Sequence, residues 1–345
     1  MAAKLFWKKS PHNMKIILVG YPSAFNLQLK EAFEQMGAEV LLVNERVNRL
    51  APGFLHDSRF LWQAVKKFTF FKEWNNRRFG HLLVELCRQT KPDVFLTTKG
   101  TTIKPETIEA IKLLGIKTAN WFPENIYNEP YYSWFLKTAK HYDFFFTFDS
   151  SVIERFPEYG NLHYLPFAVD IKPFNDIKIT EEDRRRYSCD VCLIGARYPE
   201  REELLNSIKD LNIKIYGWKD WKSSPLASYY HGPLNPAESV KAYRCAKICL
   251  NTNINPPING VNAKTFEIAA SGGFQLSDYR KDVEDLFAVG QEIDIFRDEG
   301  ELKNKIRFYL DHEEDRARIA AAGRSRVLKD HTMDRRAKKI IESVR

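Results

Sequence analysis

The sequence has no apolar run long enough to cross a membrane. A spanning helix needs roughly 20 consecutive apolar residues, and none of the 345 residues lies in such a run. The first 13 residues carry lysines but lack the apolar segment of a signal peptide. Low-complexity segments and short repeats are also missing. These absences favour a cytoplasmic globular protein, and at roughly 150 residues per domain the length allows two domains or one large one.

Cysteine is scarce, and the five residues form an odd number in a chain without a secretion signal. This indicates free thiols in a reducing compartment. Cys189 and Cys192 have the spacing of half a zinc site, but the residues around them are typical of a β-strand. Positions i and i+3 of a strand point to opposite faces. We therefore expect buried structural thiols and no metal site.

Charge is unevenly distributed along a chain of ordinary globular composition. Hydrophobic residues make up 44% and charged residues 28%, which excludes disordered and collagen-like proteins. Of the net charge of +8, residues 1–150 carry +7, residues 151–330 carry −2 and residues 331–345 carry +3. A basic surface favours an anionic partner, such as nucleic acid, a phosphorylated substrate or membrane headgroups.

Strand-like apolar runs alternate with helix-like segments along the chain. The expected strands of the first half are residues 14–20, 38–43, 92–97, 118–122 and 144–148. Those of the second half are residues 190–195, 213–217, 248–251 and 274–277. Helices are expected between them, for example at residues 105–114 and 263–270. Such alternation indicates βαβ units and mainly parallel sheets.

Because the pattern restarts after residue 170, we expect an α/β protein with two Rossmann-like domains facing across a cleft. The first domain is predicted over residues 1–170 and the second over residues 171–330. The linker is placed at residues 165–170 and in the polar stretch 172–186. Residues 331–345 are predicted to form a helix that returns to the first domain. Ligands of such sheets bind outside the carboxyl ends of the strands, so the cleft is the expected site.

A glycine turn follows the first strand of the second domain. Glycine at position 195 lets the backbone approach a phosphate closely, and a helix start favours an anion. Arg197 and Arg201 would add charge-assisted hydrogen bonds. The full G-x-G-x-x-G motif is absent, so this is not a dinucleotide fingerprint. An ordinary turn with surface arginines is the alternative interpretation.

A second motif is a polar Gly/Asn loop that leads into the helix expected at residues 263–270. Lys264 and Glu267 stand three residues apart and share a face of that helix. A lysine in the first turn opposes the helix dipole, and a bound anion would explain it. Glu267 is suited to accept hydrogen bonds from ribose hydroxyls. The alternative is a simple surface Lys–Glu pair.

Residues 266–274 resemble the donor-site helix of GT-B glycosyltransferases. The resemblance continues in an ordered set of motifs at residues 276–278, 283–287, 301–302, 306–310, 320–324 and 331–332, and residues 165–170 are similar to the start of the GT-B interdomain link. Together they are similar to the CgeB-like, spore-maturation-type branch, over about residues 190–332. The resemblance implies a sugar transfer from a nucleotide-sugar substrate, a UDP-sugar, held by the second domain. It implies no separate cofactor and no metal, and an acceptor that is a glycan, a lipid-linked molecule, a protein or a small molecule.

The resemblance also implies roles for particular residues. Glu267 would bind the ribose, and Lys264 would neutralise the diphosphate. The first glutamate of the family's E-x7-E signature falls at Asn259 here, so retention or inversion at the sugar carbon stays open. Trp218 would stack on the nucleobase, although a core position is the alternative. The predicted donor-binding residues are Gly195, Arg197, Arg201, Trp218, Gly232, Asn262, Lys264, Thr265 and Glu267.

A catalytic base should come from the first domain and reach the acceptor hydroxyl. Glu124 is the first candidate and Asp149 the second, since each follows an expected strand. For each, a structural cap at a strand end is the alternative. No Asp-x-Asp motif stands at a strand end, which argues against the metal-dependent GT-A fold. A GT-B enzyme can stabilise the leaving diphosphate with positive side chains and helix dipoles.

The segment from Arg59 to Arg88 combines seven lysines and arginines with many aromatic residues and two glutamates. This composition suits a membrane interface, which would place the protein peripherally on the inner face, or a lipid-linked acceptor. Single-stranded nucleic acid is a weaker interpretation, since no nucleic-acid motif occurs. A packed helix is the alternative, because Phe79, Leu82, Leu83 and Leu86 have core-facing spacing.

Two other functions are compatible with the sequence. One is a non-catalytic or epimerase-like protein that binds a nucleotide-sugar. The other, less favoured, is a nucleic-acid-binding module that uses the basic half.

Overall fold

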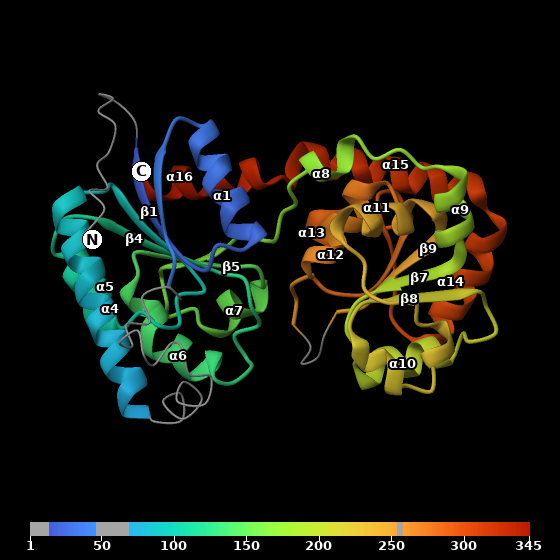
Figure 1. The fold of residues 1–345 in the computed structure, drawn as a ribbon, viewed down its shortest axis with the longest axis horizontal. Coiled ribbons are helices and arrows are strands. Elements are labelled where there is room, and N and C mark those ends of the chain that lie inside the picture. The colour runs from blue at the N-terminus through green and yellow to red at the C-terminus, as the bar shows by residue number, and fades with distance from the viewer. Residues whose placement is uncertain (1–13, 46–68, 254–257) are drawn as a thin grey trace. The chain divides into compact units, whose positions relative to one another are not determined.

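A computed structural model describes residues 14–45, 69–253 and 258–345, and of residues 69–72 the backbone alone. The chain forms two compact units, which are described separately (Figure 1). The first unit comprises the described residues up to Phe148, together with Val152–Leu165 and Arg336–Arg345. The second comprises Asp149–Ser151 and Pro166–Arg335.

The first unit contains a six-stranded parallel sheet in the order β2-β1-β3-β4-β5-β6. Its strands are β1 (Lys15–Val19), β2 (Glu39–Val43), β3 (Val94–Thr98), β4 (Lys117–Phe122), β5 (Phe144–Thr147) and β6 (Leu162–Tyr164). In register, Ile17 of β1 pairs with Leu41 of β2 and with Phe95 of β3. Strands β1 and β3 are apolar nearly throughout because both of their faces are buried.

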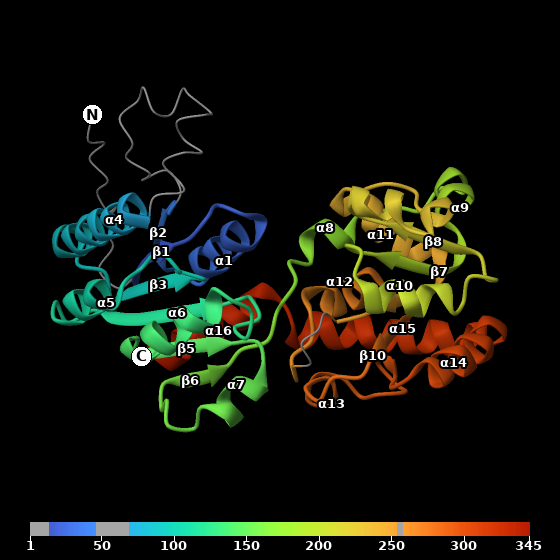
Figure 2. The same ribbon diagram turned by 90° about the horizontal axis from the view of Figure 1, so that it is seen from below.

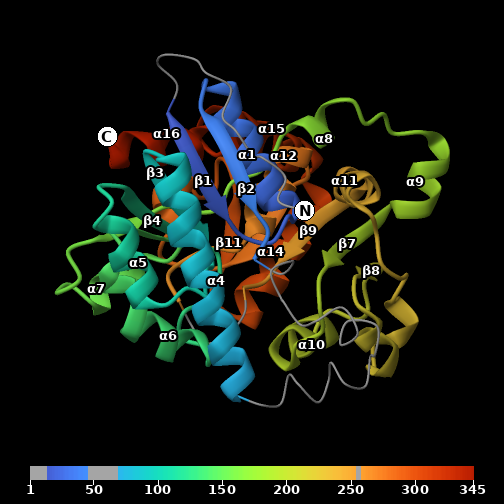
Figure 3. The same ribbon diagram turned by 60° about the vertical axis from the view of Figure 1, so that its left-hand side comes forward.

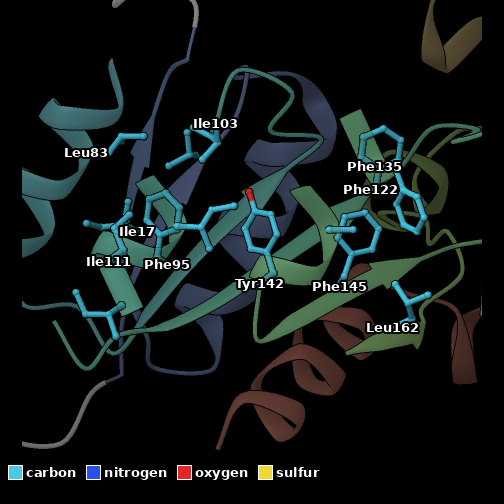
Figure 4. Close-up of a cluster of buried hydrophobic side chains, with 14 of the residues drawn as sticks. Ile17, Leu83, Phe95, Ile103, Ile111, Phe122, Phe135, Tyr142, Phe145 and Leu162 are labelled. Carbon is cyan, nitrogen blue, oxygen red and sulfur yellow. The ribbon is translucent and has the colours of Figure 1, made fainter. Parts of the chain in front are cut away.

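Helices cover both faces of this sheet. They are α1 (Ala24–Gln35), α4 (Thr69–Thr90), α5 (Pro105–Lys112), α6 (Tyr131–Thr138), α7 (Ser150–Arg155) and α16 (Met333–Val344). One buried cluster joins side chains of α4, α5, α6 and α7 to the strands, among them Leu83, Ile111 and Phe135 (Figure 4). Helices α1 and α16 lie on the opposite face (Figures 1 and 2).

The second unit contains a five-stranded parallel sheet in the order β11-β10-β9-β7-β8. The neighbouring strands β7 and β8 are visible in Figure 3. Its strands are β7 (Cys189–Ile194), β8 (Ile213–Tyr216), β9 (Ala246–Asn251), β10 (Gln275–Asp278) and β11 (Asp294–Phe296). Its helices are α8 (Lys172–Asn175), α9 (Glu181–Tyr187), α10 (Pro199–Asn206), α11 (Pro236–Cys245), α12 (Ala263–Ser271), α13 (Val283–Leu286), α14 (Glu299–Asp311) and α15 (Glu313–Asp330). The expected fold class of two parallel-sheet α/β domains is confirmed.

The polar stretch at residues 172–186, expected as part of the linker, instead forms α8 and α9 of the second unit. Thr180 and Asp183 form a reciprocal capping box at the start of α9. Asp183 also accepts a hydrogen bond of 2.9 Å from the ammonium group of Lys241 in α11. The charged residues of this stretch therefore cap a helix and form an ion pair. Composition alone does not distinguish such a helical segment from a linker.

The expectation that Cys189 and Cys192 point to opposite faces is wrong. The N–H groups of Asp190 and Val191 both donate to the carbonyl oxygen of Asn212, over 2.9 and 3.3 Å, which is the pattern of a β-bulge. Cys189 and Cys192 lie in the same buried cluster. All five cysteines are free thiols, as expected. No group of three or more His, Cys, Asp or Glu side chains within the described ranges is arranged to hold a metal ion.

Candidate active site

A cavity of about 160 Å³ opens where three neighbouring strands of the second unit end. Its walls come from α10, which follows β7, and from the ends of β9 and β10 with the residues after them. In the sheet, β9 lies between β7 and β10. The lining residues are Tyr198, Glu200, Arg201, Leu204, Thr252, Asn253, Asp278 and Arg280. The carboxyl edge of a parallel sheet is where ligands of such folds bind. Of these residues, the sequence predicted only Arg201 as a site residue.

The side chain of Arg201 extends across the turn after β7 and reaches Thr252, directly after the neighbouring strand β9. Its Nε donates to the hydroxyl of Thr252 over 2.7 Å and its Nη2 to the Thr252 carbonyl over 2.8 Å, while Nη1 donates to the carbonyl of Ala196. A Cβ at Gly195 would lie 2.6 Å from Nη1, so the guanidinium fills the space beside this glycine. Burial lowers the pKa of Arg201. Arg201 is thus a half-buried cation whose hydrogen-bond acceptors are all uncharged.

Arg197, predicted to contact the phosphate, is bound to a neighbouring carboxylate. Its Nε lies 2.5 Å and its Nη2 3.1 Å from the two carboxylate oxygens of Glu202. The hydrogen bond to Glu202 raises the pKa of Arg197. Arg197 does not line the cavity. These contacts are those of the surface arginine that the sequence left as the alternative.

The start of α12 is held by an amide network. Asn262 caps the helix by accepting the N–H of Thr265, and its Nδ2 donates to Asn251 Oδ1 over 3.0 Å. Thr265 is completely buried, and its hydroxyl accepts a hydrogen bond of 3.0 Å from Asn251 Nδ2. The predicted contact between the Thr265 side chain and a ligand therefore needs correction, because this side chain faces the interior and supports the cap.

Lys264 and Glu267 lie on the partly exposed face of α12, as their spacing predicted. Their side chains are 36% and 39% exposed, and Lys264 Nζ lies 3.3 Å from Glu267 Oε2. Tyr243 of α11 lies near this pair. It was not predicted as a site residue, because an aromatic residue in an amphipathic helix is typical of a hydrophobic core. Burial, with a contribution from Glu267, raises its pKa. Its buried hydroxyl has no hydrogen-bond partner among the described residues.

Trp218 follows β8 and is 74% exposed, so the alternative of a core position is wrong for this residue. The core tryptophan of this region is Trp221, which is fully buried. Gly232, another predicted donor-site residue, accepts the N–H of Gly217 over 3.0 Å in a left-handed backbone conformation with φ of +98°. Neither Trp218 nor Gly232 lines the cavity. Trp218 thus offers an open aromatic face at the carboxyl edge of the sheet.

Glu124, the first candidate base, lies just beyond β4 in the first unit. Its carboxylate is 3.0 Å from Lys99 Nζ, and its side chain is partly exposed. Lys99 has a left-handed backbone with φ of +65°, and its ammonium group lies 4.5 Å from the ring centre of Tyr131. Burial disfavours the charge of Lys99, but hydrogen bonds to Tyr131 and Glu124 outweigh it and raise the pKa. Glu124 is therefore a partly exposed carboxylate just beyond a strand end, paired with a neighbouring cation.

Asp149, the second candidate, follows β5 but belongs to the second unit. It is only 2% exposed. One carboxylate oxygen, Oδ1, accepts the backbone N–H groups of Ser151, Asn259 and Gly260 over 3.0 to 3.1 Å. These contacts are those of a structural cap, the alternative to a catalytic role.

The basic and aromatic segment from Arg59 to Arg88 is described only in part. Residues 59–68 lie outside the described residues, and the remainder forms α4. Phe79 and Leu83 are buried as expected, whereas Leu82 is exposed because it lies on the outer face of the helix. Trp74 is also exposed, with the Arg78 guanidinium 5.5 Å from its ring. Within the part of the chain that the structure describes, no helix has the length and apolarity of a membrane span.

Comparison with known proteins shows which proteins this chain resembles. Residues 187–342 match the model of the family described as Glycosyl transferase-like. This part of the chain is therefore similar to glycosyltransferases, and the two α/β units have the GT-B fold, as the sequence motifs predicted. It is similar to Spore protein CgeB of Bacillus subtilis (strain 168), with 24% identity over 306 residues that cover 77% of this chain and 92% of the relative. The expected resemblance to CgeB-like glycosyltransferases is thereby confirmed.

Solved structures share the fold over nearly the whole chain. A glycosyltransferase from Rickettsia africae ESF-5 has a TM-score of 0.66 at 12% identity, covering 96% of this chain and 98% of the other. Anabaena Alr3699/HepE in complex with UDP and glucose has a TM-score of 0.64 at 10% identity, covering 96% and 99%. Sucrose-phosphate synthase from Thermosynechococcus elongatus has a TM-score of 0.64 at 11% identity, covering 96% and 98%.

Proposed function

We propose that this glycosyltransferase uses a nucleotide-sugar, and specifically a UDP-sugar, as its donor. The observation that carries the proposal is Arg201, a half-buried cation at the carboxyl edge of the second unit's sheet whose hydrogen-bond acceptors are all uncharged. A cation in such a place is suited to an anionic ligand. Support comes from HepE, a protein of the same fold whose structures hold UDP and UDP-glucose.

Other accessible side chains of the second unit are suited to the parts of such a donor. Lys264, in the first turn of α12, would exchange part of its contact with Glu267 for the diphosphate. Glu267 would then accept hydrogen bonds from the ribose hydroxyls. The exposed ring of Trp218 would stack on the uracil base. In this proposal each role falls on a side chain that is accessible in the second unit.

The chemistry needs a stabilised leaving group and a proton acceptor. The bond between the anomeric carbon and the diphosphate oxygen breaks, and its electron pair stays on the diphosphate. Cationic side chains fixed beside that oxygen stabilise the growing charge, so the proposed transfer requires neither a metal nor a separate cofactor. The acceptor oxygen forms the new bond to the sugar, and its proton passes to a base, for which Glu124 is the first candidate.

The acceptor is proposed to bind to the first unit, as a glycan, a lipid-linked molecule, a protein or a small molecule. Peripheral membrane contact through α4 remains part of this proposal. Trp74, Arg77 and Arg78 are exposed on that helix, which is a combination of residues suited to an anionic lipid surface.

The donor site can be tested by titrating the protein with UDP, ADP, GDP and CDP in a calorimeter. We expect UDP to bind most tightly and Glu267→Ala to weaken it by roughly 3- to 30-fold, because hydrogen bonds to the ribose are lost. Glu342→Ala is the matched control, since it removes the carboxylate of another exposed Lys–Glu pair, Lys338–Glu342 in α16. Equal affinity of the wild type and Glu267→Ala for every nucleotide would contradict the ribose assignment.

A further inference from the structure

The backbone of Lys99 has a conformation that is unfavourable for a lysine. Its φ is +65°, in the left-handed region, which costs free energy for a residue with a Cβ but not for glycine. Gly100, the next residue, also has a positive φ, of +64°. A glycine at position 99 would fit this turn after β3 better than a lysine does, so the geometry of the turn gives no reason for a lysine there.

Buried neighbours hold Lys99 in this conformation. Its N–H donates to the carbonyl oxygen of Trp121 over 3.0 Å, and its own carbonyl oxygen accepts a hydrogen bond of 3.2 Å from Asn120 Nδ2. Asn120 and Trp121 both lie in β4 and are completely buried. Strained residues that are held by their surroundings in this way are concentrated at functional sites.

The side chain of Lys99 extends to Glu124 and Tyr131, which follow the neighbouring strand β4. Its Nζ lies 3.0 Å from Glu124 Oε1 and 4.5 Å from the ring centre of Tyr131. Tyr131 packs edge-on against the fully buried ring of Phe122, with the ring centres 5.6 Å apart. The ammonium group therefore has two fixed neighbours, and it holds one oxygen of the Glu124 carboxylate.

The second carboxylate oxygen, Glu124 Oε2, accepts no hydrogen bond from the described residues. The side chain of Glu124 is 44% exposed, which lets an acceptor molecule reach the carboxylate. A base works only within hydrogen-bond reach of the proton that it removes, so the orientation of the carboxylate affects the rate of transfer. A cation that holds Oε1 limits that orientation and leaves Oε2 for the acceptor.

We propose that Lys99 is a positioning residue of the sugar transfer, which holds Glu124 through Oε1 so that Oε2 accepts the proton of the acceptor hydroxyl. The inference rests on the proposed function, in which Glu124 is the base. In this step the O–H bond of the acceptor breaks and its proton passes to Oε2, while the acceptor oxygen bonds to the anomeric carbon. The bond from that carbon to the diphosphate breaks, and its electron pair stays on the diphosphate.

The test measures the release of UDP from UDP-glucose, UDP-galactose and UDP-N-acetylglucosamine, with water as the acceptor. Lys99→Met is expected to lower kcat by roughly 10- to 100-fold, because the base loses its orientation. The affinity for UDP should stay within about 3-fold of the wild type, since the donor is proposed to bind to the second unit. Lys99→Arg, which also pairs with a carboxylate, is expected to restore part of the rate.

Lys104→Met is the matched control in the same unit. Lys104 pairs with Glu73 over 2.6 Å, and its side chain is 30% exposed, against 33% for Lys99. Its φ is an ordinary −94°. We expect this variant to keep the rate of the wild type, because the Lys104–Glu73 pair holds no proposed base.

A double variant tests whether Lys99 acts through Glu124. In a Glu124→Gln protein, adding Lys99→Met is expected to change kcat by less than about 3-fold, because no base is left to position. If Lys99→Met slows the Glu124→Gln protein as much as it slows the wild type, the positioning role is overturned.

Lys99→Gly separates this role from a contribution to stability. Glycine relieves the backbone strain, so Lys99→Gly should unfold at a higher urea concentration than Lys99→Met and yet be equally slow. If instead the glycine variant is the faster of the two, the rates follow stability and the positioning role is overturned.

The proposed function and the role of Lys99 fail in different ways. If the wild type releases UDP from none of these donors, the proposed function fails and the role of Lys99 with it. Full activity in Glu124→Gln removes the proposed base and everything that acts through it. If Glu124→Gln is slow but Lys99→Met keeps the rate of the wild type, the role of Lys99 alone is overturned.

Discussion

The indole Nε1 of Trp221 donates a hydrogen bond of 2.9 Å to the carbonyl oxygen of Gly195. A Cβ at Gly217 would lie only 2.3 Å from the same oxygen, and Gly217 has φ of +135°. The turns after β7 and β8 therefore meet at one backbone carbonyl, with a buried tryptophan as its donor. This contact fixes the turn that Arg201 crosses.

Removing the indole N–H should destabilise the second unit. In Trp221→Phe an aromatic ring is retained but the partly buried Gly195 carbonyl loses its donor, which costs about 1 to 3 kcal/mol in the free energy of unfolding. Urea unfolding followed by circular dichroism measures the change. Trp74→Phe, in the exposed part of α4, is the control and should leave stability unchanged. A Trp221→Phe protein as stable as the wild type would show that the hydrogen bond from Trp221 to Gly195 makes no net contribution to stability.

Glu124→Gln should slow sugar transfer without weakening donor binding. The amide keeps the size of the carboxylate and an oxygen that can accept from Lys99, but it cannot take a proton from the acceptor. Loss of a general base typically costs about 100- to 10,000-fold in rate. The measurement is initial-rate kinetics with a nucleotide-sugar panel, alongside a UDP titration. Full activity in this variant would exclude Glu124 as the base.

We expect Asp149→Ala to lower the stability of the protein, as loss of a structural cap would. The substitution removes the acceptor of three backbone N–H groups, of Ser151, Asn259 and Gly260. Because hydrogen bonds to a charged acceptor are among the stronger ones, we expect the free energy of unfolding to fall by about 2 kcal/mol or more. Chemical denaturation provides the value. A variant of undiminished stability that has lost activity would instead support Asp149 as the base.

The Asp183 cap gives a pH dependence with a defined sign. Hydrogen bonds from the backbone of Thr180 and from Lys241 lower the pKa of Asp183 from 3.8 to about 2. A carboxyl with a lowered folded-state pKa stabilises the protein above its unfolded-state pKa, and this contribution is lost as the pH falls through the folded-state value. Asp183→Asn should therefore be less stable than the wild type at pH 7. The difference should shrink between pH 4 and pH 2 in unfolding experiments, and a constant difference would contradict the assignment.

The larger strands could be predicted because strands buried on both faces are apolar throughout. Strands β1 and β7 appeared as such runs, bounded by glycines that end them. Strands β6 and β11 were missed because three residues are too few to form a pattern. The bulge at Asp190 was missed for a different reason, since it depends on how β7 pairs with the segment before β8.

The site was predictable only as far as strand ends could be located. Strand-end reasoning placed Arg201 at the right edge, and helical spacing paired Lys264 with Glu267. Neither pattern predicts that Arg201 reaches Thr252, because that contact depends on β7 and β9 being neighbours in the sheet. Arg280 carried no motif of its own, and its only signal was its place directly after an expected strand.

The unequal burial of the five free thiols makes them useful as internal reporters. Cys189, Cys192 and Cys249 are buried in the second unit and Cys87 in the first, while Cys245 is partly accessible. A maleimide reagent should modify Cys245 first, and each of the other thiols only when the unit that buries it opens. Mass spectrometry of the labelled peptides would then give separate opening rates for the two units, without introducing a single engineered residue.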